Sequence, residues 1–116
     1  MFYTSSCLFN SAKNKEFLLE CEKLLYTVII MHLEEHCKEC LYKLGEEHRE
    51  VHKWLDEFFI ELGPAHRAVR HHEGGVEEVR QKWGQYAADA AMLHIRSDCH
   101  GKIPTEAEAK ISSLFS

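Results

Sequence analysis

Apolar residues recur every three or four positions along most of the chain, which is the spacing of α-helices with one buried face. The first such run covers residues 14–30, and a second continues from His32 to Gly45, a residue type suited to the left-handed conformation that ends many helices. A third run extends from Glu46 to the pair Gly63 and Pro64, so the pattern predicts one helix that stops there.

The second half of the chain predicts further helices separated by glycine and proline. A short helix is expected over residues 65–73, broken by the glycine pair 74–75. A long helix is predicted over residues 76–99, and Thr105 and Glu108 have the spacing of a capping box for a short final helix. The predicted fold is all-α, a single-domain irregular bundle of four to five helices.

The distribution of histidine divides the chain in two. None of the nine His precedes His32, and all lie between His32 and His100. We therefore expect an N-terminal helical extension, residues 1–30, and a His-rich helical domain, residues 31–116. Met31 at the boundary leaves open whether the upstream residues are original or were added to the protein.

Composition narrows the class of protein. With 116 residues, 45% apolar and 28% charged, the chain has the balance of a soluble globular protein. Its net charge of −5 argues against nucleic-acid binding, which needs a basic face. No apolar stretch approaches the ~20 residues that cross a bilayer, so no membrane partner is expected. Five cysteines without a disulfide framework predict a reducing, cytoplasmic location.

Several histidines have the spacing of metal ligands. His48 and His52 form an i,i+4 pair, as do His94 and Asp98, and each pair falls on the inward stripe of its predicted helix. His72 lines the inward side of the short helix. The candidate ligands for a divalent transition metal (zinc, iron or manganese) are His48, His52, His72, His94 and Asp98.

The stretch "HRAVRHH" predicts an anion site beside these ligands. Arg67, Arg70 and His71 would bind a small anionic ligand there. "HHEGG" is also slightly similar to the His-His-Glu stretch of HD-type phosphohydrolases, but the defining His-Asp doublet is absent. Ferritin-like di-iron sites need Glu-x-x-His, which does not occur in this chain, and hemerythrin-like spacings match only loosely. His32 and His36 form a third pair beside Cys37 and Cys40, but the cysteines lack a second pair for zinc and are interpreted as core.

Four segments resemble a family of small His-rich helical proteins catalogued as a domain of unknown function: "EEHREVHKWLDEFF", "HRAVRHHEGGVEEVRQKWG", "AADAAMLHIRSD" and "GKIPTEAE". The resemblance covers about residues 31–109 and implies no activity. It implies recurrent family positions at His48, His52, His66, His71, His72, His94 and Asp98.

Two functions remain open from the sequence. The first is a His-centred metal-binding protein, a metal-dependent hydrolase of a small anionic substrate. The second is a non-catalytic interaction or dimerisation module, in which the His are structural. A homo-oligomer would then form through the N-terminal helix and its stripe of Leu24, Leu25, Val28 and Ile29.

Overall fold

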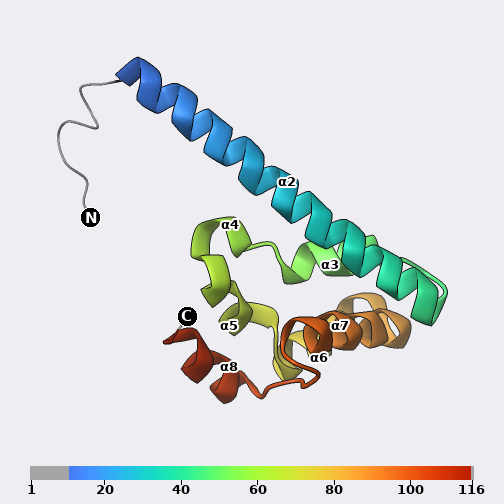
Figure 1. Cartoon of the computed structure of the whole chain (residues 1–116). Coiled ribbons are helices and arrows are strands. Elements are labelled where there is room, and N and C mark those ends of the chain that lie inside the picture. Colours follow the sequence, from blue (N-terminus) through green and yellow to red (C-terminus); the bar gives the residue numbers. More distant parts are fainter. Residues whose placement is uncertain (1–10, 116) are drawn as a thin grey trace. The chain divides into compact units, whose positions relative to one another are not determined.

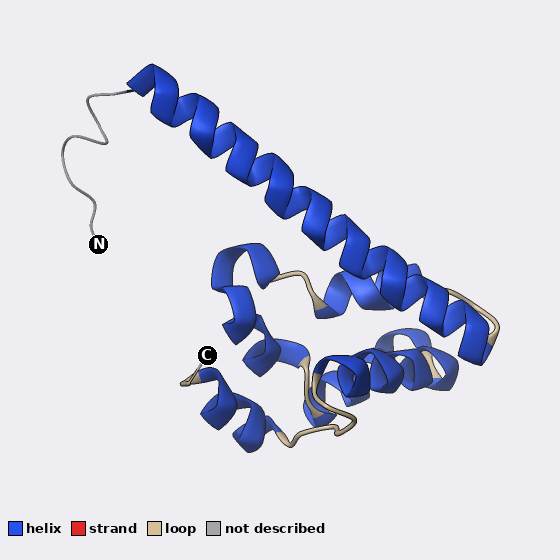
Figure 2. Cartoon of the chain, viewed as in Figure 1, coloured by secondary structure: helices blue, strands red, loops and turns tan. Residues whose placement is uncertain are grey.

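The computed structural model describes residues 11–115, with side chains from residue 15 onward. Every regular element in this range is a helix, and no strand occurs within it (Figure 2). The predicted all-α class is therefore confirmed.

The first two predicted runs form one continuous helix, α2 (Ser11–Leu44). It ends at Gly45, whose φ of 88° lies in the left-handed region that favours glycine. The Gly45 amide donates a hydrogen bond of 3.0 Å to the carbonyl of Leu41. The expected glycine cap is thus confirmed.

The chain divides into two compact units, residues 1–32 and residues 33–116. In the first unit, the described part is helical, and large apolar side chains such as Phe17 and Leu24 are exposed. No helix in the described part of the chain is long and apolar enough to span a membrane. The candidate site residues all lie in the second unit.

Beyond the end of α2, the second unit contains short helices (Figure 1). They are α3 (Arg49–Leu55), α4 (Phe59–Leu62), the 3-10 helix η1 (Gly63–His66), α5 (Arg67–Arg70), α6 (Glu73–Trp83), α7 (Gln85–Asp98) and α8 (Glu106–Ser113). Helix α6 packs on α7, α3 contacts α7, and α5 contacts α8.

Two of the predicted helices are interrupted. The prediction of one helix from Glu46 to Leu62 is wrong, because His48 adopts a left-handed φ of 53° before α3 and Asp56 ends α3. The prediction of one helix over residues 76–99 is also wrong, because Gly84 separates α6 from α7 with a φ of 96°. Glycine reaches this conformation without the steric cost that other residues bear.

The glycine pair does not break a helix, contrary to the prediction. Both glycines lie in the first turn of α6. A Cβ on Gly75 would lie 1.8 Å from the carbonyl oxygen of Arg70, so glycine lets α6 begin directly against the end of α5. The Glu73 amide donates to the carbonyl of Pro104 at 2.9 Å, which ties this start to the segment before α8.

The apolar core is built around α7. Ala87, Ala88, Ala90 and Ala91 are almost fully buried, and their small side chains allow neighbouring helices to approach closely. The larger core side chains are Val51, Leu55, Val79 and Ile95. Full burial of each contributes roughly 1.5–3 kcal/mol. This packing fixes α7, whose C-terminal turns carry His94 and Asp98. At the end of the unit, Thr105 and Glu108 form the predicted capping box of α8.

Candidate metal centre

Six titratable side chains meet within the second unit. His36 comes from α2, Asp56 follows α3, His66 ends η1, His71 follows α5, and α7 contributes His94 and Asp98. The four histidines are buried, at 0–6% exposure, and the two carboxylates are partly buried. Chain segments far apart in sequence therefore place nitrogen and oxygen donors around one point.

The Asp56 carboxylate faces three imidazoles. Its Oδ1 lies 3.2 Å from Nε2 of His66, 3.2 Å from Nε2 of His71 and 3.2 Å from Nε2 of His94. Asp98 contacts two of these rings at the same nitrogen, since its Oδ2 is 3.2 Å from Nε2 of His71 and 3.3 Å from Nε2 of His94. Both carboxylates thus approach the same two ring nitrogens.

These distances match the spacing of ligands around one ion. An N–H···O hydrogen bond is most often about 2.9 Å long. Two ligands at about 2.1 Å from one ion lie about 3.0 Å apart at a right angle and about 3.4 Å apart at the tetrahedral angle. The nitrogen–oxygen pairs that Asp56 and Asp98 form with His71 and His94 are 3.2 to 3.3 Å apart, between these two values.

The hydrogen bond on the far side of His66 fixes where its proton lies. Nδ1 of His66 is 2.7 Å from the carbonyl oxygen of Gly63, which can only accept, so Nδ1 carries the proton. In the neutral ring, Nε2 then has a bare lone pair that faces the Asp56 carboxylate. Two acceptors face each other unless a second proton or a cation lies between them.

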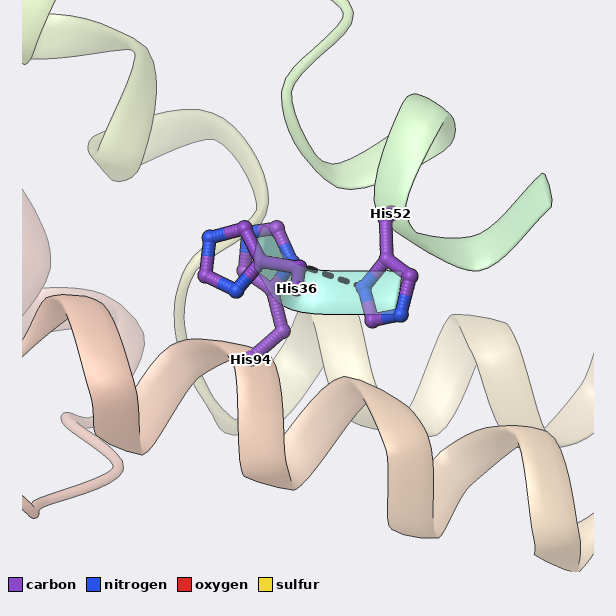
Figure 3. A group of neighbouring side chains, drawn as sticks. All are labelled: His36, His52 and His94. Atoms are coloured by element: carbon purple, nitrogen blue, oxygen red, sulfur yellow. Dashed lines mark hydrogen bonds between the residues drawn. The ribbon is translucent and has the colours of Figure 1, made fainter. Parts of the chain in front are cut away.

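The proton on the His94 ring is located in the same way, through hydrogen bonds that involve His52. Nε2 of His52 lies 2.8 Å from the carbonyl of Glu47 and donates to it, which leaves Nδ1 of His52 as an acceptor. Nδ1 of His94 donates to that atom at 2.9 Å (Figure 3). The lone pair of His94 Nε2 is therefore aimed at Asp56 and Asp98. Metal-binding histidines characteristically donate their other N–H to a second group in this way.

His36 and His71 differ in their other contacts. His36 stacks on His94 with ring centroids 3.7 Å apart, and its Nε2 lies 3.4 Å from Oδ1 of Asp98 (Figure 3). His71 is fully buried, and its Nδ1 has no hydrogen-bond partner within the described residues. The polar contacts of the His71 ring are therefore those of Nε2 with the two carboxylates.

The pKa values show how strongly these charges are coupled. Burial alone would raise the pKa of Asp56, but hydrogen bonds from His66, His71 and His94 hold it well below its ordinary value. Burial would also raise the pKa of Asp98, but hydrogen bonds from His36, His71 and His94 hold this pKa below its ordinary value. Both carboxylates are therefore anionic at neutral pH.

The pKa values of His94 and His52 shift in opposite directions. Burial disfavours the His94 imidazolium, but its contacts with Asp56 and Asp98 outweigh burial and raise its pKa to about 9. Burial, followed by the charge on His94, lowers the pKa of His52 to about 4. In the metal-free protein a proton thus occupies the lone pair of His94 that faces the carboxylates.

The donors therefore fit an ion. Two groups of side chains could hold a metal: Asp56, His71, His94 and Asp98, and the nitrogen-only group His36, His52 and His94. The first group combines two anionic carboxylates with the Nε2 atoms of His71 and His94. In the second group, Nδ1 of His94 already donates to His52, so the first group fits an ion better.

Of the predicted ligands, the structure brings His94 and Asp98 together, with His52 behind His94. His48 lies outside both groups, because it sits in the left-handed position before α3 beside Glu46. His72 also lies outside them. It caps α6, where its Nδ1 accepts from the Gly75 amide at 3.3 Å and its Nε2 donates to the Val69 carbonyl at 3.0 Å.

Of the three predicted anion residues, Arg70 does not line the pocket that the other two share. Arg70 donates to the Trp54 carbonyl and to Glu57, with its guanidinium 3.9 Å from the centre of the Trp54 ring. His71 belongs to the candidate metal centre. Arg67 and His71 both line one open pocket.

That pocket adjoins the centre. It has a volume of about 300 Å³, and His71 and Asp98 form part of its wall. The other residues that line it are Pro64, Arg67, Cys99, His100, Lys102, Ile103, Pro104, Glu108, Ala109, Ser112 and Ser113. A small molecule in this pocket would therefore reach two of the candidate ligands.

Sequence reasoning missed Asp56, His66 and His36 as part of the centre. A signal for Asp56 was present, because His52 and Asp56 repeat the H-x-x-x-D spacing of His94 and Asp98. The predicted helix through Asp56 hid its position at a helix end.

Comparison of the sequence with protein-family models, with curated proteins and with solved structures found no match. Function is therefore inferred from the geometry of the centre and its pocket.

Proposed function

We propose that this chain is a metal protein in which Asp56, Asp98 and the Nε2 atoms of His71 and His94 hold one divalent transition-metal ion, with His66 beside Asp56. One observation carries the proposal: Nε2 of His94, whose ring donates from Nδ1 on its far side, lies 3.2 to 3.3 Å from two carboxylates, and Nε2 of His71 lies 3.2 Å from the same two. An ion between them would take the place of the proton that His94 Nε2 carries in the metal-free protein.

The donor set narrows the identity and number of ions. Two carboxylates neutralise one dication, so a second ion would add uncompensated charge to a largely buried site. Two imidazoles and two carboxylates make a nitrogen and oxygen donor set without the cysteine sulfur that is common at structural zinc sites. Imidazole suits iron and carboxylate suits manganese, so Fe²⁺ or Mn²⁺ is the proposed ion, in preference to zinc.

The pocket supports a metal-dependent hydrolase of a small anionic substrate. An ion held there would act as a Lewis acid and lower the pKa of a bound water. Asp98 and His71 would anchor it where the pocket begins, and Arg67 would orient the anionic group of the substrate. Burial of His94 and His71 excludes water from the far side of the centre.

Elemental analysis by plasma mass spectrometry tests the metal. Untagged protein loaded with Fe²⁺ or Mn²⁺ without oxygen and then desalted should retain about one ion per chain. The His94→Gln variant should lose it, whereas His32→Gln, a change at an exposed histidine outside the centre, should retain it. Equal metal content in both variants, or none in the wild-type protein, would contradict the proposal.

A second candidate is self-association through the N-terminal part of α2. The observation that favours it is the exposure of Phe17, Leu18, Leu24 and Tyr26, each more than half exposed. Measuring the mass in solution of the full chain and of a variant lacking residues 1–30 tests it. A dimer that becomes a monomer on truncation supports this role, and an unchanged mass contradicts it.

A further inference from the structure

The pocket beside the centre has the features of a substrate site with a definite charge. Its wall contains His71 and Asp98 from the centre together with two cationic side chains, Arg67 and Lys102. At about 300 Å³ it lies at the lower end of the size range of small-molecule sites. It therefore fits a small molecule, one end of which meets the centre.

The charges around the pocket sum to one positive charge. With a dication bound, Asp56 and Asp98 bring the centre to neutrality. Arg67 and Lys102 then add two positive charges, with His100 counted as neutral, and Glu108 removes one. Glu108 is already held by the capping box of α8, where its carboxylate accepts from the Thr105 amide at 2.9 Å. A ligand with one negative charge balances this site.

Part of the remaining wall is apolar. Pro64, Ile103, Pro104 and Ala109 line the pocket together with the charged groups, as do Cys99, Ser112 and Ser113. A matching ligand has an anionic group at the centre and a short apolar body. Because the pocket is small, one group has to serve both as the anion and as the site of reaction.

We propose that this pocket binds a small phosphodiester and that the centre hydrolyses it, an inference that rests on the proposed metal-dependent hydrolase. A phosphodiester carries one negative charge on the atoms that react, as the charge balance requires. In the reaction, the oxygen of water forms a bond to phosphorus and one P–O ester bond breaks. The leaving oxygen takes the proton that water loses, and the other product is a phosphomonoester.

Three chromogenic esters that share the 4-nitrophenol leaving group but differ in charge test which substrate charge the pocket prefers. They are methyl 4-nitrophenyl phosphate (one negative charge), 4-nitrophenyl phosphate (two) and 4-nitrophenyl acetate (none). For each ester, the rate to compare is the metal-dependent rate of hydrolysis, which is the part of the total rate that a chelator abolishes. We expect kcat/KM for the diester to exceed that for each other ester by at least tenfold.

Variants of the two cationic residues test the pocket. Arg67→Gln and Lys102→Gln should each raise KM for the diester about tenfold, because each removes a charge-assisted contact with the phosphate. The metal content should not change, since neither side chain belongs to the centre. The control is Arg96→Gln, an exposed arginine of α7 that does not line the pocket, and its KM should equal that of the wild type.

The outcomes separate this inference from the proposed function. Faster hydrolysis of the monoester or of the acetate by metal-loaded protein would overturn the phosphodiester assignment and leave the hydrolase in place. Metal-loaded protein that hydrolyses none of the three would overturn the phosphodiester assignment and leave only the metal centre. An equal KM in Arg67→Gln, Lys102→Gln and Arg96→Gln would overturn the role of the pocket. Wild-type protein that retains no metal would overturn the proposed function, and this inference with it.

Discussion

Replacing Asp56 with Asn should weaken metal binding without changing the shape of the site. The carboxylate lies 3.2 Å from Nε2 of each of His66, His71 and His94, and it carries one of the two charges that balance a dication. The amide keeps a similar volume but leaves the site one positive charge in excess. Removing one partner of a buried charge pair costs about 3–5 kcal/mol. At about 1.4 kcal/mol per factor of ten, the dissociation constant of the metal should rise roughly 10²- to 4×10³-fold.

Competition with a chromogenic chelator at fixed pH measures this change. Asp89→Asn is the matched control, because Asp89 lies on α7 but outside the centre. Its carboxylate accepts a hydrogen bond from the Gln85 side chain. Circular dichroism of both variants would verify that the helices remain. If Asp56→Asn retains its helical content and binds metal within a factor of three of Asp89→Asn, the proposed coordination by Asp56 is refuted.

Three further predictions follow from the same geometry. Because the pKa of His94 is raised to about 9 from an unfolded value near 6.5, metal-free protein should lose about 3 kcal/mol of stability as pH rises from 6.5 to 9. Over the same range the affinity for metal should rise about tenfold per pH unit, because the ion has to displace the proton from His94. Denaturant unfolding and metal titrations at several pH values measure the two quantities, and an affinity that does not change with pH would contradict the role of His94. His52→Leu should weaken metal binding about 10- to 100-fold by removing the acceptor of His94 Nδ1, whereas His48→Asn should have no effect, and chelator competition compares the two. Gly75→Ala should lower the free energy of unfolding by more than about 2 kcal/mol, because the added Cβ would overlap the carbonyl oxygen of Arg70. Gly101→Ala should lower it by about 1 kcal/mol, from the positive φ alone. Equal losses for the two variants in denaturant titrations would contradict the packing argument.

The all-α class could be predicted because helical periodicity is a local property. The spacing of apolar residues located the helices, and Gly45 and the capping box at Thr105 identified two of their ends correctly. The interruptions at Asp56 and Gly84 were not predicted, since an apolar stripe continues through both positions. Where a helix stops inside such a stripe depends on tertiary contacts that periodicity does not contain.

The candidate site was predicted in part for the same reason. His94 and Asp98 share one regular helix, so their i,i+4 spacing gave their relation correctly. His48 and His72 were assigned to the inward faces of helices. Each instead lies just before the first residue of a helix, where the backbone is not helical and the ring does not follow the helix face. His66 and His36 joined the centre only through folding, because they are 30 residues apart and belong to no common helix.

Anomalous diffraction from crystals of metal-loaded protein, measured at the absorption edge of the bound metal, tests the central claim most directly. The account predicts one strong peak per chain in the second unit, about 2.0–2.3 Å from Asp56, from Asp98 and from Nε2 of His71 and His94. A peak bonded instead to His48 or His72, or no peak beside the two carboxylates, would contradict it.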